Sequence, residues 1–280
     1  MDEIALKSYA KLNLSLSIQG IREDRFHELQ SEMQSVSLCD DILMKKVPGG
    51  IGVDCNNPKV PEGESNIAYK AARRFFEFTK IKSGIMITIR KNIPVAAGLA
   101  GGSSNAAAVI FGLDKLFETR LSLVQLASIG VEVGSDVPFC LSGGRCMVRG
   151  RGEVVQKLPM LAKMWFVIAV PDVEVATKWA YEEYDRWMLK VKDVKGVKEA
   201  KAVMHNDLEA AVSAKFPVIK ELEKKLINAG AISSSMSGSG PSVFAMCSSE
   251  AHAQKVLEKV KGEFPRSFVA GSVDFAVEVI

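Results

Sequence analysis

Residues 94–104, PVAAGLAGGSS, combine the residue types that bind phosphate: glycines, small side chains and two adjacent serines. Glycine lets backbone N–H groups approach an anion closely, and a helix that starts after such a turn adds the positive end of its dipole. The stretch has no lysine and matches neither the GxxxxGKS/T nor the GxGxxG pattern. The residues by themselves leave two interpretations open, a nucleotide-phosphate site and a tight strand-to-helix turn.

A second serine- and glycine-rich stretch, SMSGSGPSVF at residues 235–244, runs into an apolar segment. Alone, it is typical of a flexible turn between two elements. Together with residues 94–104, it favours a phosphate cage closed by two loops from different parts of the chain.

Lys11 in AKLNL and Asp136 in GSDVPF are the charged candidates for catalysis. An aspartate in a partly desolvated pocket can act as a general base, and a nearby lysine would favour its ionised form and stabilise developing negative charge. Each residue alone is more often a helix cap or half of a surface ion pair, and sequence spacing does not show that they meet. His27 in DRFHEL has the chemistry to pair with a nucleobase edge, although a structural histidine is the commoner outcome.

The hydrophobic pattern indicates which elements hold these residues. Apolar and polar residues alternate over residues 12–19, which predicts a half-buried strand directly after Lys11. The run IMITIR at 85–90 predicts a strand that leads into the glycine turn. A helix capped by Ser103 or Ser104 is expected to follow that turn.

A strand at 164–170 opens the second half of the chain, and helices are expected over about 178–190, 217–229 and 250–261. The charged segment KVKDVKGVKEAK at 190–201 is expected to be solvated. Strands and helices alternate in blocks without internal repeats, so the fold class is α+β. At 280 residues the chain is long enough for two domains, which we place at 1–157 and 158–280.

The composition is that of an ordinary soluble globular protein, with 48% hydrophobic residues and a net charge of +3. This charge is too small to make nucleic-acid binding the default. No signal peptide or membrane-spanning run is recognisable, so a cytoplasmic location is expected. The five cysteines form no CxxC pair and are interpreted as free thiols; no metal-binding motif is present, and a monomer or weak homodimer is expected.

Six stretches in order along the chain resemble the GHMP kinase superfamily, and within it the 4-diphosphocytidyl-2-C-methyl-D-erythritol kinase family. They are AKLNL (10–14), GIREDRFHEL (20–29), PVAAGLAGGSSNAA (94–107), GSDVPF (134–139), NDLE (206–209) and MSGSGPSVF (236–244). They span nearly the whole chain. Six ordered matches are far more specific than one glycine-rich turn.

This resemblance implies a fold, a reaction and its ligands. The fold would have an N-terminal ATP-binding domain like domain 2 of ribosomal protein S5 and a C-terminal ferredoxin-like domain, with the active site in the cleft between them. The enzyme would phosphorylate the 2-hydroxyl of a cytidine-diphosphate-linked methylerythritol in non-mevalonate isoprenoid biosynthesis, with ATP and Mg²⁺. Its partners would be these small molecules, with no nucleic acid and no membrane.

The resemblance also implies roles for individual residues. Asp136 would accept the proton of the substrate hydroxyl, and Lys11 would stabilise the transferring phosphoryl group. The residues implied in substrate binding are Asn13, Phe26, His27, Thr177 and Tyr181, with Trp179 as an alternative to Tyr181 for stacking on the cytosine. The residues implied in ATP binding are Asn66, Lys91, Pro94, Val95, Ala96, Ala97, Gly98, Leu99, Ala100, Gly101, Gly102, Ser103, Ser104, Gly238, Ser239 and Gly240.

Three positions depart from the family pattern. Ala100 stands where the family has a glycine, and we expect this position to have ordinary backbone dihedrals. Arg25 also replaces a glycine, and Phe26 replaces a tyrosine, which keeps an aromatic face but removes a hydroxyl. The alternatives are another GHMP kinase, acting on mevalonate, phosphomevalonate or homoserine, and a non-catalytic nucleotide sensor of the same fold.

Overall fold

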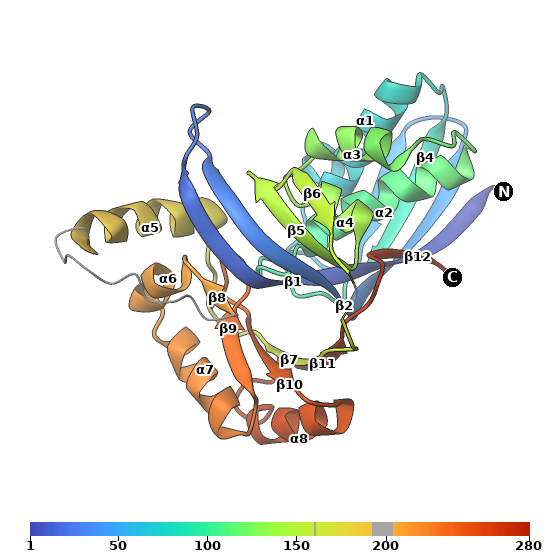
Figure 1. Ribbon diagram of the computed structural model, residues 1–280. Helices are drawn as coiled ribbons and strands as arrows, with labels where there is room; N and C mark the ends of the chain where they lie inside the picture. Colours follow the sequence, from blue (N-terminus) through green and yellow to red (C-terminus); the bar gives the residue numbers. More distant parts are fainter. Residues whose placement is uncertain (160, 192–203) are drawn as a thin grey trace.

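The computed structural model describes residues 1–159, 161–191 and 204–280, and its ribbon shows two sheets, each with helices on one side (Figure 1). Most of the charged segment at 190–201 lies outside the described residues. The main strands of the first sheet lie in the order β12-β1-β2-β4-β3. In addition, β5 pairs with β2 and with β6, and β8 pairs with β1. Its strands are β1 (Glu3–Ile21), β2 (His27–Val47), β3 (Ile51–Cys55), β4 (Gly84–Arg90), β5 (Arg145–Gly150), β6 (Val154–Lys157), β8 (His205–Asn206) and β12 (Val277–Val279).

The long hairpin of β1 and β2 is the framework on which the first sheet is built. The predicted strand at 12–19 is confirmed and forms part of the 19-residue β1. Three irregularities in the β1–β2 register, between Tyr9 and Ala10, Asn13 and Ser15, and Ile18 and Gly20, interrupt the regular ladder. Such bulges increase strand bending and twist. The hairpin therefore curves away from the sheet, and its tip stands apart in Figure 1.

Helices cover one face of this sheet and form its hydrophobic core. They are α1 (Ile67–Thr79), α2 (Gly101–Leu116), α3 (Leu123–Val131) and α4 (Val137–Ser142), preceded by the 3₁₀ turn η1 (Gly63–Ser65). Asn66 caps α1, since its side chain accepts a hydrogen bond from the N–H of Ala68 at 2.8 Å. The prediction that Ser103 or Ser104 caps α2 was wrong: the helix begins at Gly101 with Ala100 as its N-cap.

The second sheet has the order β11-β7-β10-β9 and lies beneath the hairpin in Figure 1. Its strands are β7 (Trp165–Ala169), β9 (Ser233–Met236), β10 (Val243–Cys247) and β11 (Ser267–Gly271). The helices of this half are α5 (Thr177–Val191), α6 (Glu209–Lys215), α7 (Val218–Asn228) and α8 (Glu250–Val260). Although β8 and β12 belong to the C-terminal half of the chain, they pair with β1 in the first sheet. The boundary at 157/158 falls between β6 and β7 and remains a prediction.

The two sheets are joined by a shared apolar cluster. Alternate residues of β7 point to opposite faces, as in any strand. Val167 packs among the C-terminal helices, whereas Phe166 and Ile168 pack against Leu12 of β1 and against Leu99 of the glycine turn. The glycine turn is thus anchored in the core between the sheets.

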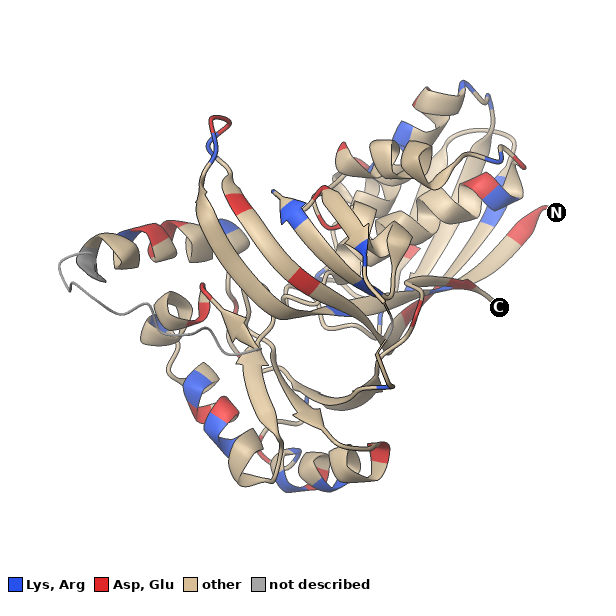
Figure 2. Cartoon of the chain, in the orientation of Figure 1, with Lys and Arg blue, Asp and Glu red and all other residues tan. Residues whose placement is uncertain are grey.

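Basic and acidic residues are interspersed along α7 and at the hairpin tip (Figure 2). None of the helices in the described part of the chain is long and apolar enough to cross a bilayer. All five cysteines, each of them described, are free thiols, as predicted.

Candidate active site

A cleft of about 1100 Å³ lies between the hairpin, the glycine turn, the start of α5 and the loop after β9. It brings together the residues that the sequence predicts for the site, with two exceptions, Ser104 and Trp179. Ser104 is fully buried and donates its hydroxyl hydrogen to the backbone oxygen of Tyr9 at 2.7 Å, so it faces away from the cleft. Trp179 packs on Phe216, with ring centroids 5.6 Å apart.

The turn before α2 alternates between ordinary and left-handed backbone conformations. Ala96, Gly98 and Ala100 have φ values of 54°, 73° and 56°. The expectation that Ala100 has ordinary dihedrals was therefore wrong, because the chain must reverse there to enter α2. An L-residue in this region costs about 1 kcal/mol relative to glycine. The result is that Gly101, Gly102 and Ser103, at the start of α2, line the cleft.

The two glycine-rich loops touch directly at Gly98. The Ser237 hydroxyl donates to the Gly98 carbonyl oxygen at 3.1 Å. A Cβ atom on Gly98 would lie 2.2 Å from the Ser237 carbonyl oxygen and 3.0 Å from that of Gly240. Only glycine allows the loops to approach this closely.

Lys11 lies at the centre of this contact, in the part of β1 that faces the cleft. Its side chain is buried, and its ammonium group donates to the Gly98 carbonyl oxygen at 3.0 Å and to the side-chain oxygen of Asn13. Burial lowers the pKa of Lys11, and the nearby negative charge of Asp136 partly opposes this effect. Asn13 is fixed in turn, since its side-chain N–H donates to the Ser31 hydroxyl at 2.8 Å.

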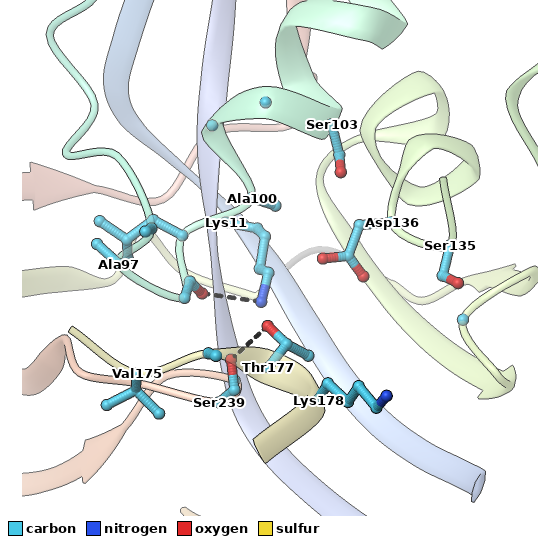
Figure 3. A pocket seen from close by; sticks show the side chains of 18 of the residues that line it. Lys11, Ala97, Ala100, Ser103, Ser135, Asp136, Val175, Thr177, Lys178 and Ser239 are labelled. Carbon is cyan, nitrogen blue, oxygen red and sulfur yellow. Dashed lines mark hydrogen bonds between the residues drawn. The ribbon is translucent and has the colours of Figure 1, made fainter. Parts of the chain in front are cut away.

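Asp136 precedes α4 and reaches the same space from the opposite wall. In Figure 3 the Asp136 carboxylate lies across the cleft from the Lys11 side chain, with the Ser103 hydroxyl on the side of α2. No described residue hydrogen-bonds to the Asp136 carboxylate, so its oxygens are available to a ligand. Thr177, at the start of α5, and Ser239 share a hydrogen bond of 2.9 Å below this space.

Aromatic side chains from the turn of the hairpin and from α5 line another part of the cleft. His27 stacks on Tyr181 with ring centroids 4.9 Å apart and an interplanar angle of 30°. Burial, reinforced by the charge of Asp136, raises the pKa of Tyr181, so its phenol stays neutral. Phe26 is half exposed, and the guanidinium of Arg151 lies 5.2 Å from its ring centroid. His27 therefore covers one face of the Tyr181 ring, and a base that pairs with the imidazole edge must lie beside the imidazole.

Comparison with known proteins identifies the family. The N-terminal domain model of the GHMP kinases matches residues 66–144, and the C-terminal model matches residues 187–266. The chain belongs to the GHMP kinase family. The predicted family, the two-part α+β fold and the assignment as a kinase are confirmed.

Curated relatives of this GHMP kinase match it over nearly its full length. The 4-diphosphocytidyl-2-C-methyl-D-erythritol kinase of Acetivibrio thermocellus is 41% identical, covering 98% of this chain and 100% of the relative. The kinase of the same name from Gloeobacter violaceus is 40% identical, covering 94% and 92%. A solved structure of 4-(cytidine 5'-diphospho)-2C-methyl-D-erythritol kinase superposes with a TM-score of 0.81 at 29% identity, covering 96% of this chain and 99% of that one. A homoserine kinase from Cytophaga hutchinsonii shares the fold, with a TM-score of 0.77 at 24% identity.

Two residues predicted near ATP lie in the cleft but have their polar atoms engaged within the protein. The Lys91 ammonium is paired with Asp40 and donates to the side-chain oxygen of Asn105 at 3.1 Å. It lies beneath α2, where a Cβ on Gly101 would come within 3.0 Å of it. The Asn66 amide caps α1 and donates to the Pro61 carbonyl oxygen at 2.8 Å.

The lining residues of this GHMP kinase that the sequence reasoning missed include the charged side chains of Arg151, Lys178 and Asp185. A signal for Asp185 was present, since it lies four residues after Tyr181 and so shares a helix face with it. Arg25 adopts a left-handed backbone conformation with φ of 65°, a region that favours glycine.

The cleft of this GHMP kinase also offers a place for Mg²⁺. Mg²⁺ prefers oxygen ligands and usually combines one or two protein groups with phosphate oxygens and water. The Ser103 hydroxyl and the Asp136 carboxylate are such groups, and both face the cleft. Within the described residues, no cluster of three or more His, Cys, Asp or Glu is placed to bind a metal. These residues therefore fit an ion held mainly by the phosphates of a nucleotide.

Proposed function

We propose that this GHMP kinase transfers the γ-phosphoryl group of ATP to the 2-hydroxyl of 4-diphosphocytidyl-2-C-methyl-D-erythritol. The observation that carries the proposal is the meeting of Lys11, Asp136 and the two glycine-rich loops in one cleft that also contains the Phe26–His27–Tyr181 group. The names and identities of the curated relatives support the same acceptor.

The chemistry follows from which atoms are available. Phosphoryl transfer depends on in-line positioning and charge stabilisation rather than on covalent help from the protein. Asp136 accepts the proton of the acceptor hydroxyl as its oxygen forms a bond to the γ-phosphorus; the bond from that phosphorus to the β,γ-bridging oxygen breaks, and ADP leaves. The Asp136 carboxylate suits this role because no described residue hydrogen-bonds to it.

Lys11 and the start of α2 supply the positive charge. The Lys11 ammonium is held by the Gly98 carbonyl and Asn13, so it is positioned before any ligand binds and need not reorganise during the reaction. The N–H groups at residues 101–103 and the dipole of α2 face the position of the ATP phosphates. Mg²⁺, when bound, would neutralise phosphate charge; the Ser103 hydroxyl would hold it, which leaves the Asp136 carboxylate free to accept the proton.

The acceptor end of the cleft separates this proposal from its main rival, a GHMP kinase for mevalonate, phosphomevalonate or homoserine. We assign Asn13 and Thr177 to the methylerythritol and phosphate portions and the Phe26–His27–Tyr181 group to the cytosine. None of the rival acceptors contains a ring that needs an aromatic group of this kind. Lys11 and Asp136 are both present, which argues against a nucleotide sensor.

A competition experiment tests the acceptor. CDP should inhibit competitively against the proposed acceptor and non-competitively against ATP, because it occupies the aromatic end of the cleft and leaves the glycine loops free. Inorganic pyrophosphate at the same concentration is the control for general anion effects. Competition with ATP alone would favour the rival acceptors.

A further inference from the structure

His27 and Asp185 form a polar contact between the β1–β2 hairpin and α5. The His27 Nε2 atom lies 2.8 Å from a carboxylate oxygen of Asp185, and the two side chains are 12% and 40% exposed. Tyr181 stacks on one face of the imidazole, and Tyr184 meets its edge with ring centroids 6.4 Å apart. These contacts fix both the plane of the imidazole ring and its rotation about the Cβ–Cγ bond.

This contact determines which imidazole nitrogen carries hydrogen. A carboxylate can only accept a hydrogen bond, so Nε2 must be the donor. In a neutral imidazole the hydrogen on Nε2 leaves Nδ1 as an acceptor. No described residue hydrogen-bonds to Nδ1, and His27 lines the cleft, so this acceptor is available to a ligand.

We propose that Asp185 is a positioning residue that makes His27 select cytosine over uracil. The inference rests on the proposed function. Cytosine carries an amino group, a donor, where uracil carries a keto oxygen, an acceptor. An acceptor at Nδ1 receives a hydrogen bond from the cytosine amino group. The uracil keto oxygen has no hydrogen to donate, so its lone pair would face the lone pair of Nδ1. A site built to accept a hydrogen bond rejects the analogue that lacks the donor, because a polar atom is then left unpaired.

Asp185→Leu tests this directly because leucine removes the acceptor from Nε2 and frees both the ring rotation and the choice of nitrogen. The substrates are the cytidine-linked acceptor and its uridine-linked analogue, and the measure is the ratio of their kcat/KM values. We expect the wild type to favour the cytidine compound by about 10- to 100-fold. In Asp185→Leu this ratio should fall to within about threefold, through a higher KM for the cytidine compound at little-changed kcat.

Two further variants separate positioning from simple structural damage. Glu183→Leu makes the same chemical change two residues earlier on α5, where the carboxylate pairs with Arg186 at 2.7 Å and does not line the cleft. It should keep the wild-type ratio. Asp185→Glu retains an acceptor and should restore much of the preference. A wild-type ratio of the two kcat/KM values in Asp185→Leu, whether or not both values fall, would overturn the proposal.

NMR of the His27 ring nitrogens needs no turnover, so it tests the role of Asp185 even if the acceptor has been wrongly assigned. The ¹⁵N shifts of the His27 ring should show hydrogen on Nε2 and none on Nδ1 in the wild type, and a mixture in Asp185→Leu. Hydrogen on Nδ1 in the wild type would overturn the inference whatever the substrate. Failure of the wild type to phosphorylate the cytidine compound, with hydrogen on Nε2, would instead refute the proposed function.

Discussion

Gly98→Ala should both destabilise the protein and weaken the ATP site, because Gly98 is where the two glycine-rich loops meet. The new Cβ would lie 2.2 Å from the Ser237 carbonyl oxygen, whereas ordinary contact begins near 3.4 Å. The loops must therefore separate by about 1 Å. This breaks the bond from the Ser237 hydroxyl to the Gly98 oxygen and moves that oxygen away from Lys11.

The cost can be assembled from these contacts. The neutral hydrogen bond contributes about 1 kcal/mol and the bond from the Lys11 ammonium about 2 kcal/mol. Placing an alanine at φ of 73° adds about 1 kcal/mol. We expect a loss of about 4 kcal/mol in the free energy of unfolding if all three terms are felt, and less where the loop relaxes.

Chemical denaturation followed by circular dichroism measures this loss, and steady-state kinetics measures KM for ATP in the same preparation. Gly262→Ala is the matched control, since a Cβ there meets nothing within 4 Å and no left-handed conformation is involved. It should unfold within about 0.5 kcal/mol of the wild type. A Gly98→Ala protein with the wild-type midpoint and the wild-type KM for ATP would refute the close loop contact.

Three further predictions concern single side chains. Ala100→Gly should raise the free energy of unfolding by up to about 1 kcal/mol, because it relieves a left-handed alanine; a fall in the denaturation midpoint would contradict the turn geometry. Asp136→Asn should retain ATP binding in a fluorescence titration while lowering kcat by about 10²- to 10⁴-fold, and near-normal turnover would remove Asp136 from the mechanism. Burial and the charge of Glu209 raise the pKa of Glu223 to about 7. Folding therefore takes up a proton at Glu223 between about pH 4.5 and 7, and the free energy of unfolding falls as pH rises through this window. Glu223→Gln should therefore gain stability relative to the wild type as pH rises through that window, whereas parallel pH profiles in denaturation would contradict the raised pKa.

The order of motifs in the sequence was enough to predict the family and most residues of the cleft. Lys11 and Asp136 are 125 positions apart, and only the resemblance to known kinases, not their spacing, indicated that they meet. The structure brings them together because β1 and the turn before α4 both border the space at the start of α2.

Other features depended on tertiary geometry that local patterns do not contain. Alanine avoids the left-handed region, so ordinary dihedrals were expected at Ala100, but the need to reverse the chain into α2 overrides that preference. Ser104 has the right residue type for phosphate, yet the rotation of α2 directs its hydroxyl into the core. His27 and Asp185 are 158 positions apart, so no local sequence pattern predicts their contact.

The most direct test of the central claim is an ADP-release assay with ATP and Mg²⁺ across a panel of alcohols. The panel contains 4-diphosphocytidyl-2-C-methyl-D-erythritol, mevalonate, phosphomevalonate and homoserine, with Asp136→Asn as the inactive reference. Rapid ADP release with the cytidine compound alone, reduced to near background in Asp136→Asn, is the predicted result. No release with that compound and clear release with one of the others would contradict the assigned acceptor.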